Sequence, residues 1–246
     1  MALVVALFSA KGSPGATTLG EALVAVMSRA GSAVLVELDP DGGDRAVAPG
    51  LSLQPGLTTL AAAGRHGALS EDVFVQHLQE LPAGGQVLVG PASAVQAHAA
   101  LASIVPSLAP AFAAFETGYV VADCGRMRSR SPALDVARHA TVAIVVTRPT
   151  LDGVEHARER VAGLDDLGAR TRLVLVGRQP YGPDEVARAL GVPVLGVLAH
   201  DHGGAQLVRA GQAVSRAGRR SFYMRSVGTL MGALMSDRAM PTSVGA

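Results

Sequence analysis

Short apolar runs separated by amphipathic stretches dominate the hydrophobic pattern of the chain. The apolar runs have the length of buried strands: Leu3–Leu7, Ala33–Leu38, Gln86–Gly90, Tyr119–Asp123, Ala140–Thr147, Arg172–Gly177 and Val192–Leu198. The stretches with a helical spacing of apolar residues are Thr17–Ala30, Leu151–Leu167, Asp184–Leu190 and Ser221–Ser236. Continuous apolar strands that alternate with helices are typical of a parallel sheet covered on both faces. We therefore predict an α/β fold with a doubly wound, mostly parallel sheet of about seven or eight strands and helices on both faces.

Proline and glycine mark the less regular segments between these elements. From Leu51 to Pro82 we expect short helices separated by glycine and proline breaks. The alanine-rich stretch Ala94–Glu116 is predicted to be a helix or a helix pair interrupted at Pro106 and Pro110, because proline removes a backbone donor from a helix.

The segment Phe8–Thr18, with the sequence FSAKGSPGATT, combines the end of a strand, a glycine-rich turn and the start of a helix. Backbone N–H groups converge on phosphate in that context. Gly12 and Gly15 let the main chain approach an anion closely, because glycine adopts backbone angles that a side chain forbids. Thr17 and Thr18 lie at the helix start, where a hydroxyl can bind Mg²⁺ or cap free amides. The segment therefore predicts a phosphate-binding loop.

The loop departs from the Walker A motif, GxxxxGK[ST], because Ala16 stands where the motif has lysine. Lys11, earlier in the loop, is the only lysine among the 21 basic side chains. The segment resembles the deviant Walker A motif of the MinD/ParA family, KGGxGKT[ST], which begins with a second, signature lysine. On that pattern Lys11 is the signature lysine and Ser13 replaces a glycine. The alternative is an ordinary surface lysine before a turn.

Carboxylates follow two further strands. Glu37 and Asp39 begin the sequence ELDPDGGD, and Asp123 ends the strand YVVAD. Carboxylates at a strand end beside a phosphate loop suit the handling of Mg²⁺ and water. The first group resembles the DxDxxG switch segment of the MinD/ParA family, and Asp123 resembles a Walker B aspartate. The alternative for ELDPDGGD is a polar turn, since turns use aspartate, proline and glycine.

The resemblance to the MinD/ParA family implies a role for each of these residues. Lys11 is expected to reach across a homodimer interface to the partner's nucleotide, and Asp39 to orient the attacking water. These two residues are the predicted catalytic groups. Mg²⁺ is predicted to lie near Thr17, Asp39 and Asp123. The predicted ATP-binding residues are Lys11, Gly12, Ser13, Gly15, Ala16, Thr17, Thr18 and Arg178.

The back half of the chain carries fewer signals. The family's adenine-contacting asparagine falls at Gly177, which leaves Arg178 and the loop Ala199–Gly203 to flank a base. Five arginines precede or enter the last predicted helix: Arg209, Arg216, Arg219, Arg220 and Arg225. We expect this helix to close the core rather than to contact DNA or a membrane surface, because the segment lacks a clean basic stripe.

Length, net charge and cysteine content limit the classes of protein to which the chain could belong. A length of 246 residues suits one domain, predicted over residues 1–236, with a disordered tail over residues 237–246. The net charge of +1 gives no support to DNA binding. One cysteine, Cys124, is too few for the Fe–S members of the family, which need paired cysteines. The first apolar run is too short for a signal peptide or a transmembrane segment, so we expect a cytoplasmic protein.

Two functional hypotheses follow from the resemblance. The first is an ATP-binding, nucleotide-dependent dimerisation switch that positions a protein partner and hydrolyses ATP weakly, because Ala16 replaces the phosphate-binding lysine. The second is a degenerate, non-hydrolysing pseudo-ATPase that acts as a scaffold or recruitment module. Degenerate loops of this kind are similar to those of the pilus-associated CpaE/TadZ branch.

Overall fold

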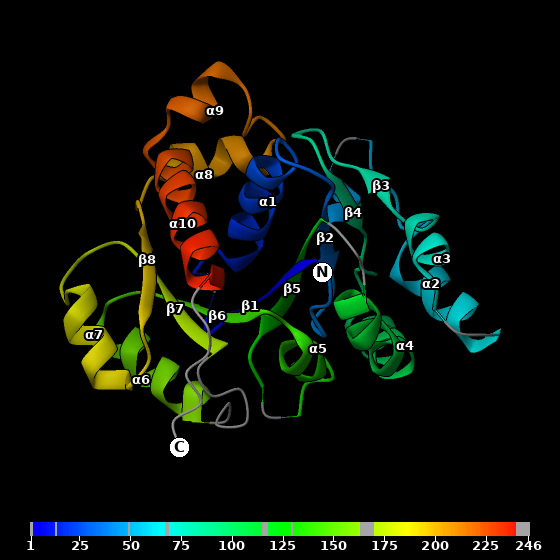
Figure 1. The fold of residues 1–246 in the computed structure, drawn as a ribbon, viewed down its shortest axis with the longest axis horizontal. Coiled ribbons are helices and arrows are strands. Elements are labelled where there is room, and N and C mark those ends of the chain that lie inside the picture. Colours follow the sequence, from blue (N-terminus) through cyan, green and yellow to red (C-terminus); the bar gives the residue numbers. More distant parts are fainter. Residues whose placement is uncertain are drawn as a thin grey trace.

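The computed structural model describes residues 2–12, 14–48, 50–66, 69–114, 118–128, 130–162 and 170–239. In this part of the chain the strands form one sheet in the order β3-β4-β2-β5-β1-β6-β7-β8 (Figure 1). The strands are β1 (Leu3–Ser9), β2 (Ala33–Glu37), β3 (Gln79–Glu80), β4 (Gln86–Leu88), β5 (Tyr119–Arg126), β6 (Val142–Thr147), β7 (Thr171–Val176) and β8 (Val194–Leu198). Neighbouring strands pair in parallel, except that β3 and β4 pair antiparallel. The predicted mostly parallel α/β sheet is therefore confirmed.

Helices cover both faces because each central strand is apolar on both sides. β1 is buried along its whole length, and its alternate residues enter two separate hydrophobic cores. The first core is closed by α1 (Ala16–Met27), α8 (His202–Arg209) and α10 (Phe222–Ala239). The second is closed by α2 (Leu57–Ala63), α3 (Glu71–Val75), α4 (Ala94–Ala114), α5 (Leu134–His139), α6 (Leu151–Val161) and α7 (Pro183–Leu190). Figure 1 shows α1, α8 and α10 together on one side of the sheet, opposite α4, α5 and α6.

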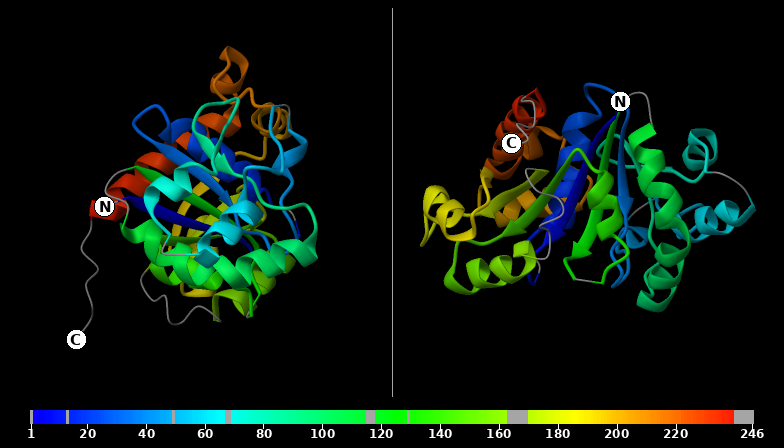
Figure 2. Two further views of the ribbon diagram at one scale, coloured as in Figure 1. Left: turned by 90° about the vertical axis from the view of Figure 1, so that its right-hand side faces the viewer. Right: turned by 60° about the horizontal axis from the view of Figure 1, so that its bottom comes forward.

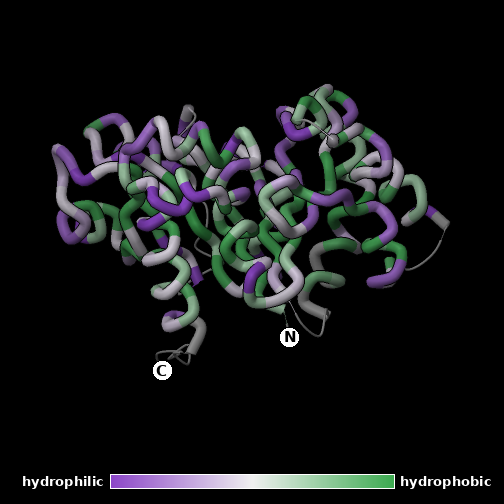
Figure 3. Tube along the Cα trace, turned by 90° about the horizontal axis from the view of Figure 1, so that it is seen from above, coloured by the Kyte–Doolittle hydropathy of each residue, from purple (hydrophilic) through white to green (hydrophobic). Residues whose placement is uncertain are grey.

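Three short helical segments complete the described structure. They are the single turns η1 (Arg45–Val47) and η2 (Gly64–His66), and the helix α9 (Arg216–Arg220). Hydrophobic segments concentrate in the interior of the molecule, and hydrophilic segments lie mainly on its outer turns (Figure 3). No helix among the described residues has the length and hydrophobicity that crossing a membrane requires.

The predicted interruption at Pro106 and Pro110 is wrong. α4 continues through both prolines to Ala114, and Figure 2 shows it as one long helix. Its inward residues Leu101, Ile104 and Leu108 are fully buried or nearly so, and the helix packs on α2 and α5. Pro106 points to solvent. Burial of the apolar face therefore outweighs the lost backbone hydrogen bond.

Several element ends also differ from the predicted ones. β5 continues to Arg126, three residues past the predicted end at Asp123. α6 is described to Val161, and residues 163–169, which include the predicted end of that helix, lie outside the described residues. α10 runs to Ala239, and its Asp237 accepts hydrogen bonds from Arg172 at 2.9 and 3.2 Å. Of the predicted tail, residues 240–246 lie outside the described residues.

The last helix occupies the position expected for an element that closes the core. Val227, Leu230 and Leu234 of α10 are at most 2% exposed and pack in the core shared with α1. The prediction that this helix completes the core is therefore confirmed. The arginines before it lie on α8 and α9, two separate short helices.

The exposed proline inside α4 generates a stability prediction. We expect Pro106→Ala to raise the free energy of unfolding by about 2 kcal/mol, because alanine restores a backbone donor in a helix interior without touching the core. Urea titration followed by circular dichroism measures the change. Ser107→Ala, at the neighbouring exposed position, is the matched control and should change stability by less than about 1 kcal/mol. A Pro106→Ala protein no more stable than the wild type would contradict this account of α4.

Candidate functional site

The candidate site lies where β1, β2 and β5 end at the same edge of the sheet. Asp123 pairs in register with Leu7 of β1 on one side and with Glu37 of β2 on the other. This is the edge at which open parallel sheets bind ligands. A cavity of about 230 Å³ opens there. The described residues that line it are Ser9, Gly12, Pro14, Gly15, Ala16, Thr17, Thr18, Glu37, Asp39, Gly42, Gly43, Asp44, Asp123, Gly125 and Arg209.

The predicted phosphate-binding loop forms one wall of this cavity. Gly12 and Gly15 have φ angles of 68° and 99°, in the left-handed region that favours glycine. Gly15 is also the residue before α1, and no side chain caps that helix. The amides of the first turn therefore face the cavity without a side-chain acceptor, as an anion-binding helix start requires. Ser13, also predicted for this loop, lies outside the described residues.

The structure separates Ala16 from Lys11, the loop's only lysine. Ala16 is the first residue of α1, lines the cavity and is 6% exposed. Lys11 does not line the cavity. Its Nζ lies 2.7 Å from Nε2 of His156 on α6, at the outer surface. Of the residues predicted for the loop, Lys11 is therefore directed away from the cavity.

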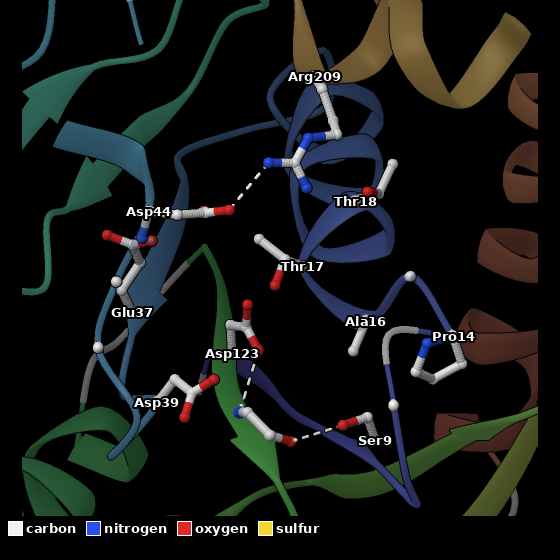
Figure 4. A pocket seen from close by; sticks show the side chains of 15 residues that line it. Ser9, Pro14, Ala16, Thr17, Thr18, Glu37, Asp39, Asp44, Asp123 and Arg209 are labelled. Atoms are coloured by element: carbon white, nitrogen blue, oxygen red, sulfur yellow. Dashed lines mark hydrogen bonds and ion pairs between the residues drawn. The ribbon is translucent and has the colours of Figure 1, made fainter. Parts of the chain in front are cut away.

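Thr17 and Asp123 are two of the three residues predicted for Mg²⁺, and both line the cavity. The Thr17 hydroxyl lies beside the Asp123 carboxylate (Figure 4), and that carboxylate accepts the Gly125 amide at 3.1 Å. Burial raises the pKa of Asp123 to about 6, although the Thr17 hydroxyl and the Gly125 amide both favour its charged form. A buried carboxylate without a cation is electrostatically unfavourable, so this arrangement fits a cation beside Thr17.

Asp39 faces Thr17 and Asp123 across the cavity (Figure 4). Its Oδ1 accepts the Asp41 amide at 2.8 Å, and burial raises its pKa above the usual value. Gly125 approaches it so closely that an added Cβ would lie 2.0 Å from the Asp39 Cγ. No group of three or more histidine, cysteine, aspartate or glutamate side chains suited to a metal occurs among the described residues. A Mg²⁺ ion here would therefore depend on phosphate and water oxygens as well as Thr17.

Glu37 has a structural role that the sequence did not predict, because its carboxylate holds two backbone segments together. Its Oε1 accepts the amides of Asp44 and Arg45 at 3.0 and 3.1 Å, and its Oε2 accepts the Gly90 amide at 2.9 Å. The residue is 3% exposed, and burial raises its pKa to about 7 despite these three bonds. Glu37 thus ties the acidic loop, residues 38–44, to the end of β4.

Charged side chains of alternating sign form a series of ion pairs that begins at the cavity with Arg209 and Asp44. This series was not predicted from the sequence. Arg209 Nη2 lies 2.8 Å from Asp44 Oδ2, and Asp44 Oδ1 lies 3.1 Å from Arg45 Nε. Arg45 Nη1 in turn lies 2.8 Å from Glu21 Oε1, and both side chains of this last pair are buried. The only signal in the sequence was a glutamate one helical turn after Thr17, on the helix that follows the loop.

A second cavity, of about 710 Å³, lies where β7 and β8 end at the same edge of the sheet. The predicted Arg178 lines it, together with Gly177, Ala199 and His200. The structure therefore brings Arg178 and the start of the Ala199–Gly203 loop to one cavity, as a base-flanking role requires. No asparagine side chain is present at Gly177.

Comparison with known proteins rests on structure. No protein-family model and no curated protein sequence matches the chain. A ParA family ATPase from Chlorobium tepidum TLS matches with a TM-score of 0.77 and 18% identity, over 95% of this chain and 98% of that chain. The cell division ATPase MinD from Pyrococcus furiosus matches with a TM-score of 0.76 and 17% identity, over 96% of this chain and 99% of that chain.

A third matching solved structure contains magnesium and a nucleotide. The septum site-determining protein MinD from Pyrococcus horikoshii OT3, in complex with Mg-ADP, matches with a TM-score of 0.61 and 17% identity, over 95% of this chain and 99% of that chain. The chain therefore has the fold of the MinD/ParA ATPases over nearly its whole length. The predicted resemblance is confirmed at the level of the fold, and the CpaE/TadZ branch stays a prediction.

The raised pKa of Asp123 predicts how stability depends on pH in the absence of Mg²⁺. The folded state holds this proton more tightly than the unfolded state, where the pKa is near 3.8. Stability should therefore fall as pH rises from about 4 through about 6, by up to roughly 3 kcal/mol from this group. Thermal unfolding in EDTA over this pH range measures the trend. In Asp123→Asn this contribution is absent, so the melting temperature should fall less with pH.

The control for this experiment is Glu159→Gln, which removes an exposed carboxylate on α6. It should retain the pH dependence of the wild-type protein. If Asp123→Asn and Glu159→Gln follow the same pH profile as the wild type, the buried Asp123 carboxylate is not the group that titrates.

Proposed function

We propose that the protein binds ATP with Mg²⁺ in the cavity at the ends of β1, β2 and β5, and that ATP closes a homodimer that positions a protein partner. The observation that carries this proposal is the Thr17–Asp123 pair beside the uncapped start of α1. The fold of the MinD/ParA ATPases supports it, since one matching structure is a complex with Mg-ADP.

Each wall of the cavity has a part in this proposal. The amides of Gly15, Ala16 and Thr17 donate hydrogen bonds to phosphate oxygens. The Thr17 hydroxyl binds the cation, and Asp123 holds that hydroxyl in position. When bound, Mg²⁺ supplies positive charge that offsets the phosphate oxygens. Asp39 faces the same space and accepts a hydrogen bond from the attacking water.

Because position 16 is alanine instead of lysine, we expect slow ATP hydrolysis. Stabilisation of charge on the transferred phosphoryl group is a large part of phosphoryl-transfer catalysis. The alanine side chain carries no charge and cannot stabilise the phosphoryl group, so hydrolysis is slow. Binding is weakened less than catalysis, because backbone amides, Thr17 and Mg²⁺ remain.

Homodimerisation rests on Lys11. Its ammonium lies at the outer surface beside His156 rather than in its own cavity. Two phosphate loops that face one another bring polyphosphate charges together, and a cation from each subunit offsets the repulsion. We therefore expect Lys11 to be the loop residue that contacts the second subunit.

The second candidate function is a pseudo-ATPase scaffold, similar to degenerate loops of the CpaE/TadZ branch. Ala16 favours it, because the loop lacks the charge that turnover needs. The two functions differ in whether nucleotide changes the assembly. If the protein is a scaffold, the assembly that binds the partner forms without ATP.

The first test of this proposal is a nucleotide titration. We expect isothermal calorimetry to detect weak ATP binding that Mg²⁺ strengthens. Ala16→Lys should raise the affinity or the hydrolysis rate by about tenfold or more, since a charge-assisted hydrogen bond contributes about 1.5–3 kcal/mol. No heat with ATP, ADP or GTP in either protein would contradict nucleotide binding. An Ala16→Lys protein that folds normally but gains neither affinity nor turnover would show that Ala16 is not the limiting defect.

The second test concerns the dimer. Lys11→Ala should abolish ATP-dependent dimerisation, measured by sedimentation, while ATP binding to one subunit changes little. The folded monomer should persist, because exposed loop substitutions rarely alter stability by more than about 0.5 kcal/mol. His156→Ala is the matched control, since it removes the contact within the subunit and leaves the ammonium. A wild-type dimer that forms without nucleotide and survives Lys11→Ala would favour the scaffold.

A further inference from the structure

The cavity carries an excess of negative charge that its own loop does not offset. Its described lining includes four carboxylates: Glu37, Asp39, Asp44 and Asp123. Ala16 removes the cation that a Walker A loop provides, and Lys11 points toward His156. Among the described lining residues, Arg209 is the only cationic side chain. A polyphosphate that enters this cavity therefore needs positive charge from Arg209 as well as from Mg²⁺.

Arg209 reaches the cavity from outside the phosphate loop. It is the last residue of α8, and in Figure 4 its guanidinium lies above Thr17 and beside Thr18, on the far side of Thr17 from Ala16. Its side chain is 48% exposed, and it forms an ion pair with Asp44. A half-exposed guanidinium on a long stem can rotate toward the cavity without disturbing the core.

The ion pair with Asp44 is one that Arg209 can leave. Asp44 also contacts Arg45 at 3.1 Å, and Arg45 is held by the buried Glu21 at 2.8 Å. Asp44 therefore keeps a cationic partner when Arg209 departs. Exchange of one half-exposed carboxylate for a phosphate group is favourable, because a guanidinium binds phosphate through two parallel hydrogen bonds.

We propose that Arg209 is the phosphate-binding cation of this site, replacing from α8 the charge that the loop lost at Ala16. This inference rests on the proposed ATP-binding function. The guanidinium exchanges Asp44 for oxygens of the bound polyphosphate. The exchange also breaks the ion pair between α8 and the acidic loop.

The test compares four proteins by calorimetry with Mg-ATP and with Mg-pyrophosphate, which lacks the base and ribose. They are the wild type, Arg209→Gln, Ala16→Lys and the double variant. Arg209→Gln should weaken both ligands by at least about tenfold. In the double variant the new lysine should recover most of the loss, because the two cations serve the same phosphates. An additional variant, Arg209→Lys, should retain part of the affinity.

The matched control is Arg219→Gln on α9, which removes an exposed arginine outside the cavity and should leave both affinities unchanged. Melting temperatures of all variants show whether each one folds, and Arg209→Gln should shift little because the lost ion pair is half-exposed.

Three outcomes would overturn the proposal. If Arg209→Gln binds both ligands as tightly as the wild type, ATP binding is intact without a role for Arg209. If the loss of affinity is not recovered in the double variant and the melting temperature is lower, Arg209 has a role in folding instead. If no variant binds either ligand, Ala16→Lys included, the proposed ATP-binding function fails and this inference fails with it.

Discussion

Unbalanced negative charge at the carboxyl edge of β1, β2 and β5 is the constraint on which the site depends. Parallel pairing brings Glu37 and Asp123 to neighbouring positions, and the loop after β2 adds Asp39 and Asp44. Burial raises the pKa values of Glu37, Asp39 and Asp123, which reflects the energetic cost of removing these charges from water. A cation that binds among them lowers that cost. This electrostatic cost supports the proposal that Mg²⁺ accompanies a polyphosphate in the cavity.

The four carboxylates of the cavity have different surroundings. Glu37 is saturated by three backbone amides and fixes the acidic loop. Asp44 pairs with two arginines, whose hydrogen bonds and charges hold its pKa below the usual value although burial works in the opposite direction. Asp39 and Asp123 are left facing Thr17 across the open space. Two carboxylates of the cluster are thus held by contacts within the protein, whereas the other two face the cavity.

Features that depend on nearby residues could be predicted from the sequence. The strand, loop and helix around Gly12 and Gly15 follow from local pattern, and Asp123 follows from its place at a strand end. Contacts between distant segments could not be predicted. Arg209 and Asp44 are 165 positions apart, and nothing in the sequence pairs them. In the sequence Glu37 looked like a ligand-binding carboxylate, because its hydrogen bonds to the amides of Asp44, Arg45 and Gly90 form only in the folded chain. The prolines of α4 were misjudged because burial of the opposite face is a tertiary effect.

The most direct test of this account is a crystal structure with Mg²⁺ and a non-hydrolysable ATP analogue. The account predicts phosphates against the amides at the start of α1, the cation between Thr17 and the phosphates, and Arg209 turned from Asp44 to a phosphate oxygen. It also predicts the base in the cavity beside Arg178. Crystals grown at saturating analogue that show an empty cavity, or an analogue bound elsewhere while Arg209 remains on Asp44, would contradict the account.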